Sequence, residues 1–486
     1  MVDNLMCNQE LLYYKAEEYL DNINFFKYKN IHFIGIGGIG MSGIAKILCE
    51  KGYNITGSDL EDNHIINSLR LLGIKISIGH KAINVLKSDL VVKSSAISME
   101  NIEIKFAIKY GIPIISRGLM LAKLLYYHYN IIVSGSHGKT TTSGLIISIF
   151  TECNIDISFV IGGILNVLNV NAKLGKSRYF IAEADESDAS FLFLKPDIAV
   201  VTNIEKEHLD NYFNNFNNLS NTFINFINNV VPSYGLSIIC IDNKEIKRKL
   251  LKINGYIRTY GFSKDADYRA CNWVQIGLFS HFTVHRPKPF CSLRVKIILP
   301  GRHNVLNVLA SIAVSTEIGI NDKYIINGLL KFKGVNRRFH ILGKCQFKNG
   351  EALIISDYGH HPNEILSTIN AIRSVWPNKR LIHVFQPHRY SRLKLLFSEF
   401  VNVLALSEEL FLLNVFSLNE NFINCVDSKD LLDNIRQRFL NYKVTLINND
   451  EIFLYLNLSV NDGDIILMQG AGNIHYLALN LLNLHN

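Results

Sequence analysis

The sequence predicts an α/β fold divided into about three domains, and three observations lead to this prediction. The chain has 486 residues, which is too long for one hydrophobic core and suits about three domains. Short apolar strands alternate with helical segments along most of the chain, a pattern typical of parallel sheets covered by helices. Two of these strands run directly into glycine-rich turns, which we interpret as the openings of the first and second domains.

The composition is that of a globular protein, with 48% hydrophobic and 19% charged residues. The first thirty residues lack the basic and apolar regions of a signal peptide, and no apolar run is long enough for a membrane span. We therefore expect a cytoplasmic protein. The net charge of +8 comes without a Lys/Arg block, so no nucleic-acid partner is expected. The eight cysteines are scattered without a C-x-x-C pair and predict reduced thiols.

The first segment, residues 1-123, begins with a strand at 31–34 and the turn Gly35-Ile36-Gly37-Gly38-Ile39-Gly40. These glycines allow a tight turn, and the N-terminus of the following helix attracts a diphosphate. Asp59 follows a second strand at 54–56. By itself the motif leaves open NAD, another diphosphate, or a turn that binds nothing. Further strands are expected at 74–78, 90–93 and 112–115.

The second segment, residues 124-335, carries a stronger phosphate-binding motif. A strand at 131–133 leads into Gly135-Ser136-His137-Gly138-Lys139-Thr140-Thr141, and a helix follows to about residue 150. Backbone N–H groups of such a loop cradle phosphates, the lysine reaches the β and γ oxygens, and the threonine hydroxyl can ligate Mg²⁺. The sequence therefore predicts a triphosphate site. Further elements are expected as strands at 179–182, 198–201 and 238–241, a β-rich stretch at 256–299, and a helix from about 304.

Acidic residues follow one of the strands of this second segment. Glu183, Asp185, Glu186 and Asp188 come directly after the strand at 179–182, at the sheet edge where ligands of open α/β sheets bind. Carboxylates close to a triphosphate form a natural Mg²⁺ site, because hard cations prefer oxygen ligands. His208 follows the next strand, where a lone histidine would ordinarily have a structural role.

The third segment, residues 336-486, has expected strands at 353–356, 381–385, 410–415 and 464–468. Two polar runs follow these strands, at 357–362 and 386–392. Histidine and arginine at strand ends suit the recognition of carboxylates and phosphates. Neither run has the Cys/His spacing of a zinc site.

Together these motifs resemble the Mur ligase family, in the family's order from about residue 31 to residue 474. The resemblance is carried by His32–Ala45, Gly135–Thr142, Glu183–Leu192, Gly301–Asn307, Asp357–Pro362, Phe385–Arg392 and Gly470–Ile474. It implies a Rossmann-like N-terminal domain for a UDP-sugar, a central P-loop ATPase domain, and a Rossmann-like C-terminal domain. Within the family, the motifs are most similar to those of the member that attaches L-alanine.

The resemblance also implies a reaction. ATP would activate the carboxylate of UDP-N-acetylmuramate as an acyl phosphate, and the neutral amine of L-alanine would attack it, releasing ADP and phosphate. This is a step in the synthesis of peptidoglycan precursors. Mg²⁺ is the implied cofactor, and a monomer or homodimer is the implied assembly.

The site residues follow from the resemblance, motif by motif. Lys139, Glu183, His208, Arg389 and Arg392 would be catalytic, with Thr140, Glu183 and His208 as Mg²⁺ ligands. ATP would contact Gly135, Ser136, His137, Gly138, Lys139, Thr140, Thr141, His303, Asn307, Arg338 and Asp357. The UDP-sugar would contact Gly35, Gly37, Gly38, Gly40, Ser58, Asp59, His80 and Ser95. The muramoyl and alanine groups would contact Tyr358, His360, His388, Arg389 and Arg392.

The sequence departs from the family's pattern in two places. Ser136 replaces the usual threonine of the phosphate loop, which is a mild change. Asn414 and Phe416 stand where the family has Asp and Tyr, with Leu418 following, and this changes the expected amino-acid pocket. Three alternatives stay open: an NAD-dependent oxidoreductase, a related ligase that attaches a preformed tripeptide, and a non-catalytic nucleotide-binding protein.

Overall fold

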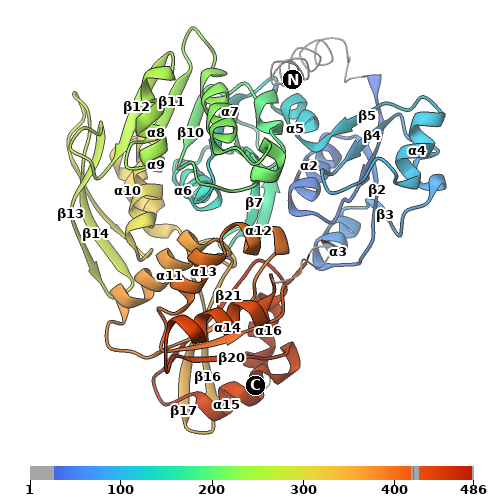
Figure 1. Cartoon of the computed structure of the whole chain (residues 1–486). Coiled ribbons are helices and arrows are strands. Elements are labelled where there is room, and N and C mark those ends of the chain that lie inside the picture. Colours follow the sequence, from blue (N-terminus) through green and yellow to red (C-terminus); the bar gives the residue numbers. More distant parts are fainter. Residues whose placement is uncertain (1–26, 418–419, 421–425, 484–486) are drawn as a thin grey trace. The chain divides into compact units, whose positions relative to one another are not determined.

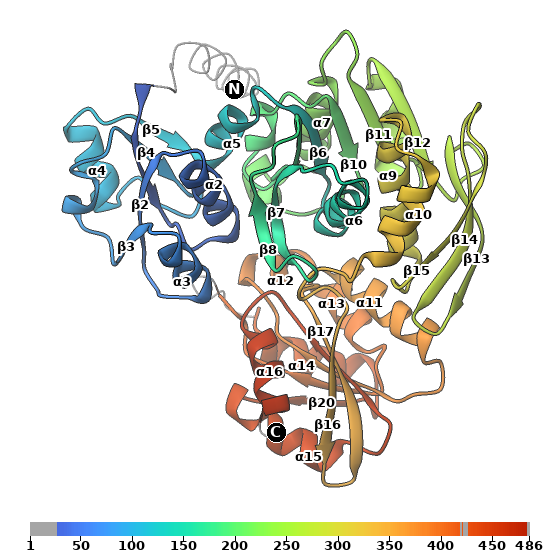
Figure 2. The same cartoon turned by 180° about the vertical axis from the view of Figure 1, so that it is seen from behind.

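Three largely parallel sheets of five, ten and six strands organise the computed structural model, which describes residues 27–417, 420 and 426–483 (Figures 1 and 2). The expected α/β class is confirmed. By its contacts the chain divides into two units. The first comprises Met1–Cys271, Thr283–Leu293 and Leu306–Phe332, and the second comprises Asn272–Phe282, Arg294–Val305 and Lys333–Asn486. The expected boundaries at 123 and 335 stay a prediction.

Two expectations fall partly or wholly on residues that are not described. The expectation that the first thirty residues contain no signal peptide concerns mainly residues 1–26, which lie outside the described residues. Leu418 also lies outside them. Among the helices that are described, none is both long enough and apolar enough to cross a membrane.

The first sheet is parallel and has the strand order β3-β2-β1-β4-β5. Its strands are β1 (Asn30–Ile34), β2 (Asn54–Asp59), β3 (Lys75–Ile78), β4 (Leu90–Lys93) and β5 (Ile114–Ser116). From β1 the chain adds strands on one side of the sheet as far as β3 and then continues on the other side with β4 and β5. Ligands of such sheets bind beyond the carboxyl ends of the strands where this order switches, here between β1 and β4. The expected strand at 112–115 begins only at Ile114, because Gly111 turns the chain at φ +67° and Pro113 has no N–H to donate.

Helices cover this first sheet, and most of them begin at a polar capping residue. They are α2 (Ile39–Glu50), α3 (His64–Leu71), α4 (Ile102–Lys109) and α5 (Arg117–Leu125), with a short 3-10 turn η2 (Ala82–Val85). The side chains of Asn63, Asn101 and Ser116 accept hydrogen bonds from the first turns of α3, α4 and α5. The start of α2 is different, because Gly38 caps it without a side chain. The N–H groups at the start of α2 are therefore not used by a cap side chain.

The second sheet has the order β15-β14-β13-β12-β11-β10-β6-β9-β7-β8. Its strands are β6 (Tyr129–Ser134), β7 (Ser158–Leu165), β8 (Val170–Lys173), β9 (Tyr179–Glu183), β10 (Ile198–Val201), β11 (Leu236–Cys240), β12 (Tyr256–Gly261), β13 (Tyr268–Ile276), β14 (Phe279–His285) and β15 (Leu293–Ile297). β6 pairs in parallel with both β9 and β10, so the three strands end at one edge. β7 and β8 were not predicted, because Gly162-Gly163 inside β7 has the composition of a turn.

The helices of this part are α6 (Lys139–Glu152), α7 (Phe216–Asn228), α8 (Lys244–Lys249), α9 (Arg302–Glu317) and α10 (Asp322–Lys331). α6 and α10 lie side by side (Figure 2). A Cβ on Gly328 of α10 would lie 2.5 Å from the Cα of Ile149, so glycine is required for this close approach. α9 begins two residues before the expected start. Asn304 therefore lies inside its first turn and donates to the carbonyl of Pro300 at 2.8 Å.

The third sheet has the order β16-β17-β21-β18-β19-β20, and only β16 is antiparallel. Its strands are β16 (His340–Phe347), β17 (Gly350–Asp357), β18 (Leu381–Phe385), β19 (Glu409–Leu412), β20 (Lys443–Leu446) and β21 (Ile465–Gln469). The expected strand at 410–415 ends at Leu412. Beyond it, the N–H groups of Leu413 and Phe416 donate to Phe385 and Pro387, so the chain continues beside the segment that follows β18.

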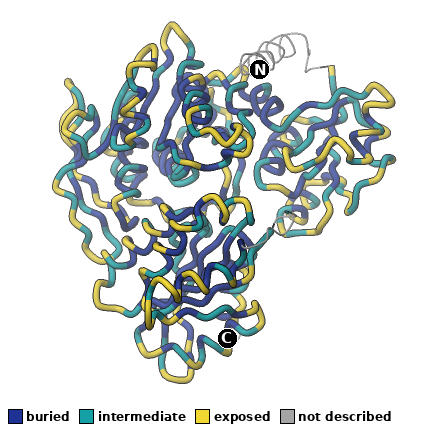
Figure 3. The backbone as a smooth tube through the Cα atoms, viewed as in Figure 1, coloured by how far each residue is buried: buried dark blue, intermediate teal, exposed yellow. Residues whose placement is uncertain are grey.

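The helices around the third sheet are α11 (Pro362–Val375), α12 (Tyr390–Leu395), α13 (Phe397–Leu404), α14 (Ser428–Arg438), α15 (Ile452–Ser459) and α16 (Ile474–Asn483). Figure 3 shows that the buried residues gather in the strands of each sheet. Apolar clusters lie on both faces of the third sheet, as expected for parallel strands covered by helices on both sides.

One buried group of this core, His383 in β18, predicts a pH effect on stability. The residue is 0% exposed, and burial lowers the pKa of its imidazole to about 3. In the unfolded chain a histidine has a pKa of about 6.5, so below that pH the unfolded state takes up a proton that the folded state does not. This group should therefore reduce stability as the pH falls, by about 1.4 kcal/mol between pH 7.5 and pH 5.5.

Urea unfolding of the wild type and of His383→Leu at these two pH values checks this prediction. The loss of unfolding free energy between pH 7.5 and pH 5.5 should be about 1.4 kcal/mol smaller in the variant. Equal losses in both proteins would mean that His383 is not held neutral by the fold.

Candidate functional site

The phosphate loop joins β6 to α6, and two of its glycines cannot be replaced without displacing neighbours. Gly135 and Gly138 have φ values of +128° and +84°. A Cβ on Gly135 would lie 2.1 Å from Oγ1 of Thr202, and one on Gly138 would lie 2.5 Å from Oδ1 of Asn307. Lys139, Thr140 and Thr141 follow in the first turn of α6, where the helix N-terminus favours anions.

Residues after the neighbouring strand β10 hold this loop in shape. The N–H of His137 donates to Oδ1 of Asn203 at 2.8 Å, and the N–H of Ser136 donates to the Asn203 carbonyl at 3.1 Å. The hydroxyl of Thr202 donates to the carbonyl of His137 at 2.6 Å. The sequence analysis gave Thr202 and Asn203 no role. Their position directly after the strand beside β6 was the available signal.

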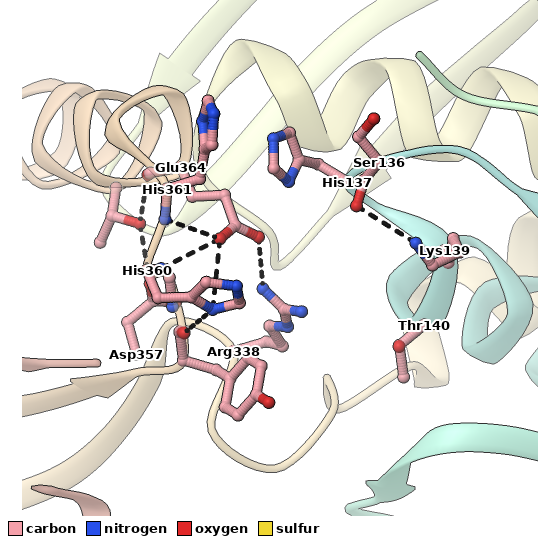
Figure 4. A network of polar contacts seen from close by, with 12 residues as sticks. Ser136, His137, Lys139, Thr140, Arg338, Asp357, His360, His361 and Glu364 are labelled. Carbon is pink, nitrogen blue, oxygen red and sulfur yellow. Dashed lines mark hydrogen bonds and ion pairs between the residues drawn. The ribbon is translucent and has the colours of Figure 1, made fainter. Parts of the chain in front are cut away.

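Lys139 is held by a carboxylate of the acidic segment. Its Nζ donates to both oxygens of Glu186 at 2.9 Å and to the carbonyl of Gly135. It also donates to the carbonyl of Ser136 at 3.2 Å (Figure 4). Burial alone would lower the pKa of Lys139, but Glu186 raises it above its usual value. Burial raises the pKa of Glu186 to about 7 against the opposing effect of Lys139, and Asp185 adds to the rise. Lys139 is therefore a charged group that is paired with Glu186.

Thr140 and Glu183 lie together at the end of β9. The hydroxyl of Thr140 donates to Oε2 of Glu183 at 3.0 Å. A Cβ on Gly162 of β7 would lie 2.9 Å from that oxygen and 3.6 Å from Oγ1 of Thr140, so glycine allows β7 to approach both oxygens closely. A hydroxyl and a carboxylate that lie this close together fit the ligand preference of Mg²⁺.

His208 lies in a second cluster of possible ligands. It adopts φ +53°, and its ligand atom lies with those of Glu186 and Glu207 within 4.8 Å of one another. The structure therefore brings Thr140 together with Glu183, and His208 together with two other carboxylates. Glu186 belongs to the acidic run that the sequence predicted as a Mg²⁺ site, although it was not among the named ligands, and Glu207 was not predicted. The role of all these residues in metal binding stays a prediction.

Arg117 connects the acidic segment with the first glycine loop. Its Nη2 donates to Oδ2 of Asp185 at 2.5 Å, and a Cβ on Gly40 would lie 2.5 Å from its Nη1. Burial raises the pKa of Asp185, but Arg117, the hydrogen bonds from Ser187 and the charge of Lys139 together outweigh this effect and hold that pKa well below its usual range. Sequence reasoning missed Arg117, because its partner lies 68 residues away along the chain.

The first glycine loop is fixed mainly by backbone contacts to β2. The N–H groups of Gly35, which has φ +81°, and Ile36 donate to the carbonyl of Ser58. The N–H of Gly37 donates to Oδ2 of Asp59 at 2.8 Å. The structure thus gives the Asp59 carboxylate a role in shaping the loop, while its contact with a UDP-sugar stays a prediction.

The other residues expected around a UDP-sugar lie at the same strand ends. The ring Nδ1 of His80 is 3.1 Å from the Ser58 hydroxyl. Ser95 is exposed in the turn after β4. Its neighbour Ser94 lies against the glycine loop, because a Cβ added to Gly35 would lie 3.2 Å from the Cβ of Ser94.

In the second unit, Asp357 and Arg338 belong to one polar network (Figure 4). The carboxylate of Asp357 accepts hydrogen bonds from four donors at 2.7–3.1 Å: Phe339 N, Gly359 N, Thr368 Oγ1 and Gln469 Nε2. Nη1 of Arg338 donates to Glu364 at 3.0 Å. Burial lowers the pKa of His303 to about 4. Asp357 therefore shapes the end of β17, and its contact with ATP stays a prediction.

Four residues expected around the substrate lie in contact with one another. The rings of Tyr358 and His360 are 5.3 Å apart, and those of His360 and His388 are 5.6 Å apart. Nη1 of Arg392 lies 3.2 Å from Nδ1 of His388 and donates to its carbonyl at 3.2 Å. Burial, with His360 and Arg392 adding to it, lowers the pKa of His388 to about 2. The imidazole of His388 is therefore neutral.

Arg389 and Phe416 border this group. Arg389 has φ +68° at the start of α12, and its Nε is 3.8 Å from Glu420. The ring of Phe416 stacks on His388 with centroids 5.8 Å apart and an interplanar angle of 8°. Phe416 thus stacks on His388 and lacks the hydroxyl that a tyrosine at this position would carry.

Three family models match the chain in consecutive segments. They are the Mur ligase family catalytic domain at residues 30–129, the Mur ligase middle domain at 133–315, and the Mur ligase glutamate ligase domain at 337–472.

Relatives and solved structures agree with these matches. UDP-N-acetylmuramate–L-alanine ligases of Legionella pneumophila strains Corby and Lens are 50% identical over 454 residues, covering 93% of this chain and 96% of theirs. The crystal structure of the UDP-N-acetylmuramate–alanine ligase from Thermotoga maritima is similar with a TM-score of 0.79 and 28% identity, covering 93% of this chain and 98% of that one. A murein peptide ligase from Psychrobacter arcticus shares the fold, with a TM-score of 0.71 and 23% identity, over 94% of this chain and 98% of its own. The chain therefore belongs to the Mur ligase family.

Proposed function

We propose that this chain is an ATP-dependent UDP-N-acetylmuramate–L-alanine ligase that works in the cytoplasm on peptidoglycan precursors. The observation that carries the proposal is the 50% identity, over 93% of the chain, to ligases of that name. The site supports it, because the first unit contains two glycine loops at strand ends, one after β1 and one after β6. Two nucleotide substrates, ATP and the UDP-sugar, require two such loops.

Positioning and charge neutralisation account for most of the chemistry expected at the phosphate loop. The γ-phosphate passes to the muramoyl carboxylate, which gives an acyl phosphate and ADP. Lys139 supplies positive charge at the transferring phosphate once that phosphate has replaced Glu186 as its partner. The start of α6 supplies backbone N–H groups to the same anion. The amine of L-alanine then attacks the carbonyl carbon, the amide bond forms, and phosphate leaves.

Mg²⁺ is the cofactor that the acidic residues fit. Thr140 and Glu183 would hold one ion, and His208 would contribute to a second. When bound, Mg²⁺ neutralises the charge that develops on the phosphate oxygens. Glu183 and Thr140 orient each other through their hydrogen bond, so the fold itself brings the two proposed ligands together.

Arg392 should affect the amino-acid or muramoyl substrate and not ATP. It lies against His388 in the group with His360 and Tyr358, where a guanidinium can bind a carboxylate. Such a charged contact contributes about 1.5–3 kcal/mol, so Arg392→Ala should lower kcat/KM for L-alanine or UDP-N-acetylmuramate about 10-fold or more.

Steady-state kinetics in each substrate separately checks this prediction. Arg438→Ala, which removes an exposed arginine of α14, is the matched control. It should leave kcat/KM unchanged for ATP, UDP-N-acetylmuramate and L-alanine. If kcat/KM for L-alanine and for UDP-N-acetylmuramate is the same in Arg392→Ala as in the wild type, Arg392 does not bind either substrate.

The proposed function is tested by measuring phosphate release from ATP with UDP-N-acetylmuramate and a panel of acceptors. We expect release with L-alanine and little with other amino acids. Preference for the tripeptide L-alanyl-γ-D-glutamyl-meso-diaminopimelate would identify the tripeptide ligase instead. Stabilisation of the protein against heat by NAD, and not by UDP-N-acetylmuramate, would favour the oxidoreductase.

A further inference from the structure

A buried carboxylate in the first unit has no part in the chemistry described so far. Glu103 lies in the first turn of α4 and is 0% exposed. Carboxylates are rarely buried unless several donors satisfy them. The donors around Glu103 therefore indicate what this carboxylate holds in place.

The two oxygens of Glu103 bind two different segments. Oε2 accepts a hydrogen bond from the Ser58 hydroxyl at 2.6 Å. Oε1 accepts from the N–H of Lys81 at 3.1 Å and from the amide of Asn84. The ring Nδ1 of His80 is 3.4 Å from Oε2. Glu103 thus joins the end of β2 to the loop that follows β3.

His32 of β1 completes the cluster. Its Nε2 is 3.6 Å from Oε2 of Glu103, and its Nδ1 is 2.8 Å from the hydroxyl of Thr56. Burial by itself would raise the pKa of Glu103, but His32, Ser58 and Asn84 together outweigh it and lower the pKa to about 2. Glu103 is therefore ionised at neutral pH and can only accept hydrogen bonds.

This acceptor sets the direction of the next hydrogen bond. Because the Ser58 O–H donates to Glu103, the Ser58 oxygen is left to accept from Nδ1 of His80, which lies 3.1 Å away. Nδ1 of His80 is thus occupied within the cluster, which leaves Nε2 as the ring nitrogen for a ligand. The backbone of Ser58 meanwhile accepts from Gly35 and Ile36 of the glycine loop. The cluster is thus continuous with that loop.

We propose that Glu103 is the positioning residue of the UDP-sugar site, which fixes the Ser58 hydroxyl and the His80 imidazole in the orientation that receives the uridine nucleotide. This inference rests on the proposed function, since it takes the loop after β1 as the place of the UDP-sugar. Glu103 itself, being 0% exposed, acts through Ser58 and His80.

Glu103→Gln tests this role with little change in size. Glutamine has one acceptor and one donor group, so it cannot accept from Ser58 on one side and from Lys81 and Asn84 on the other. We expect KM for UDP-N-acetylmuramate and the inhibition constant of UDP to rise about 10-fold or more, the scale of one lost charged hydrogen bond. The KM values for ATP and L-alanine, and kcat, should stay within about twofold of the wild type.

Glu100→Gln is the matched control, because Glu100 lies on the same segment, is 80% exposed and pairs with Lys105. It should leave all constants unchanged. Ser58→Ala provides a second variant that removes the hydroxyl between Glu103 and His80. Ser58→Ala should raise KM for UDP-N-acetylmuramate and the inhibition constant of UDP. In the double variant Glu103→Gln/Ser58→Ala, the rise in each constant should be much smaller than the product of the rises in the single variants, because the two residues act through one hydrogen-bond chain.

The outcomes separate the inference from the proposed function. If UDP does not inhibit the wild type, the proposed function fails at this loop. If UDP inhibits the wild type but both variants keep its inhibition constant, only the inference about Glu103 is wrong. A lower melting temperature with unchanged KM values would show that Glu103 merely stabilises the fold, and would also overturn the inference. If Glu103→Gln does not fold, an unchanged KM for UDP-N-acetylmuramate in Ser58→Ala overturns it, and a selective rise supports it.

Discussion

Replacing Lys139 with alanine should lower the rate of ligation by about 10²–10³-fold or more, as the loss of other charge-stabilising groups does. Lys139 begins α6 directly after the glycine turn, and its ammonium already contacts the carbonyls of Gly135 and Ser136. A phosphate cradled by this loop therefore comes within reach of the charge. The loss should appear in kcat, because the charge matters most while the phosphoryl group is transferred.

Pre-steady-state measurement of ADP formation checks the prediction, with the melting temperature as a test of folding. Lys173→Ala is the matched control, since it removes an exposed lysine that pairs with Asp156. A folded Lys139→Ala enzyme with near-normal turnover would show that the loop after β6 is not the phosphate loop of the reaction.

Glu183→Gln should raise the Mg²⁺ concentration needed for half-maximal activity by about 10–100-fold, the scale seen when the surroundings of a metal ligand are changed. The Oε2 of Glu183 accepts a hydrogen bond from the Thr140 hydroxyl and lies close to Gly162 of β7. An amide there is neutral and is a weaker ligand for a hard cation. High Mg²⁺ concentrations should restore a large part of the activity.

A Mg²⁺ titration at saturating ATP measures this effect. His208→Ala should shift the titration in the same direction, because His208 lies with Glu186 and Glu207 in the neighbouring cluster. Asp210→Asn, at an exposed position two residues from His208, should leave the titration unchanged. A Glu183→Gln titration that coincides with the wild type would place the metal elsewhere.

Local sequence signals were sufficient for most of the strands and for both loops. β1 and β6 each combine an apolar run with a following glycine turn, and both were predicted within two residues of their observed bounds. The strands β16 and β20 were missed. Both carry polar residues at buried or half-buried positions, and their place at the edges of the third sheet is set by pairing with distant segments.

Residues that hold other side chains in place by hydrogen bonds were harder to predict than residues expected to contact a substrate. Glu103 contacts Ser58, which lies 45 residues away, and Glu186 contacts Lys139, which lies 47 residues away. Neither pair is part of a single motif, so no spacing in the sequence indicates the contact. Both depend on parallel strands that bring their ends to one edge of a sheet.

The central claim is that the chain forms its amide bond through an acyl phosphate of UDP-N-acetylmuramate. UDP-N-acetylmuramate labelled with ¹⁸O in both carboxylate oxygens tests it most directly, in a single turnover with ATP, Mg²⁺ and L-alanine. The account predicts that one ¹⁸O appears in the released phosphate and one stays in the amide product, because the phosphate leaves with the oxygen that it received. Released phosphate without ¹⁸O would contradict the account.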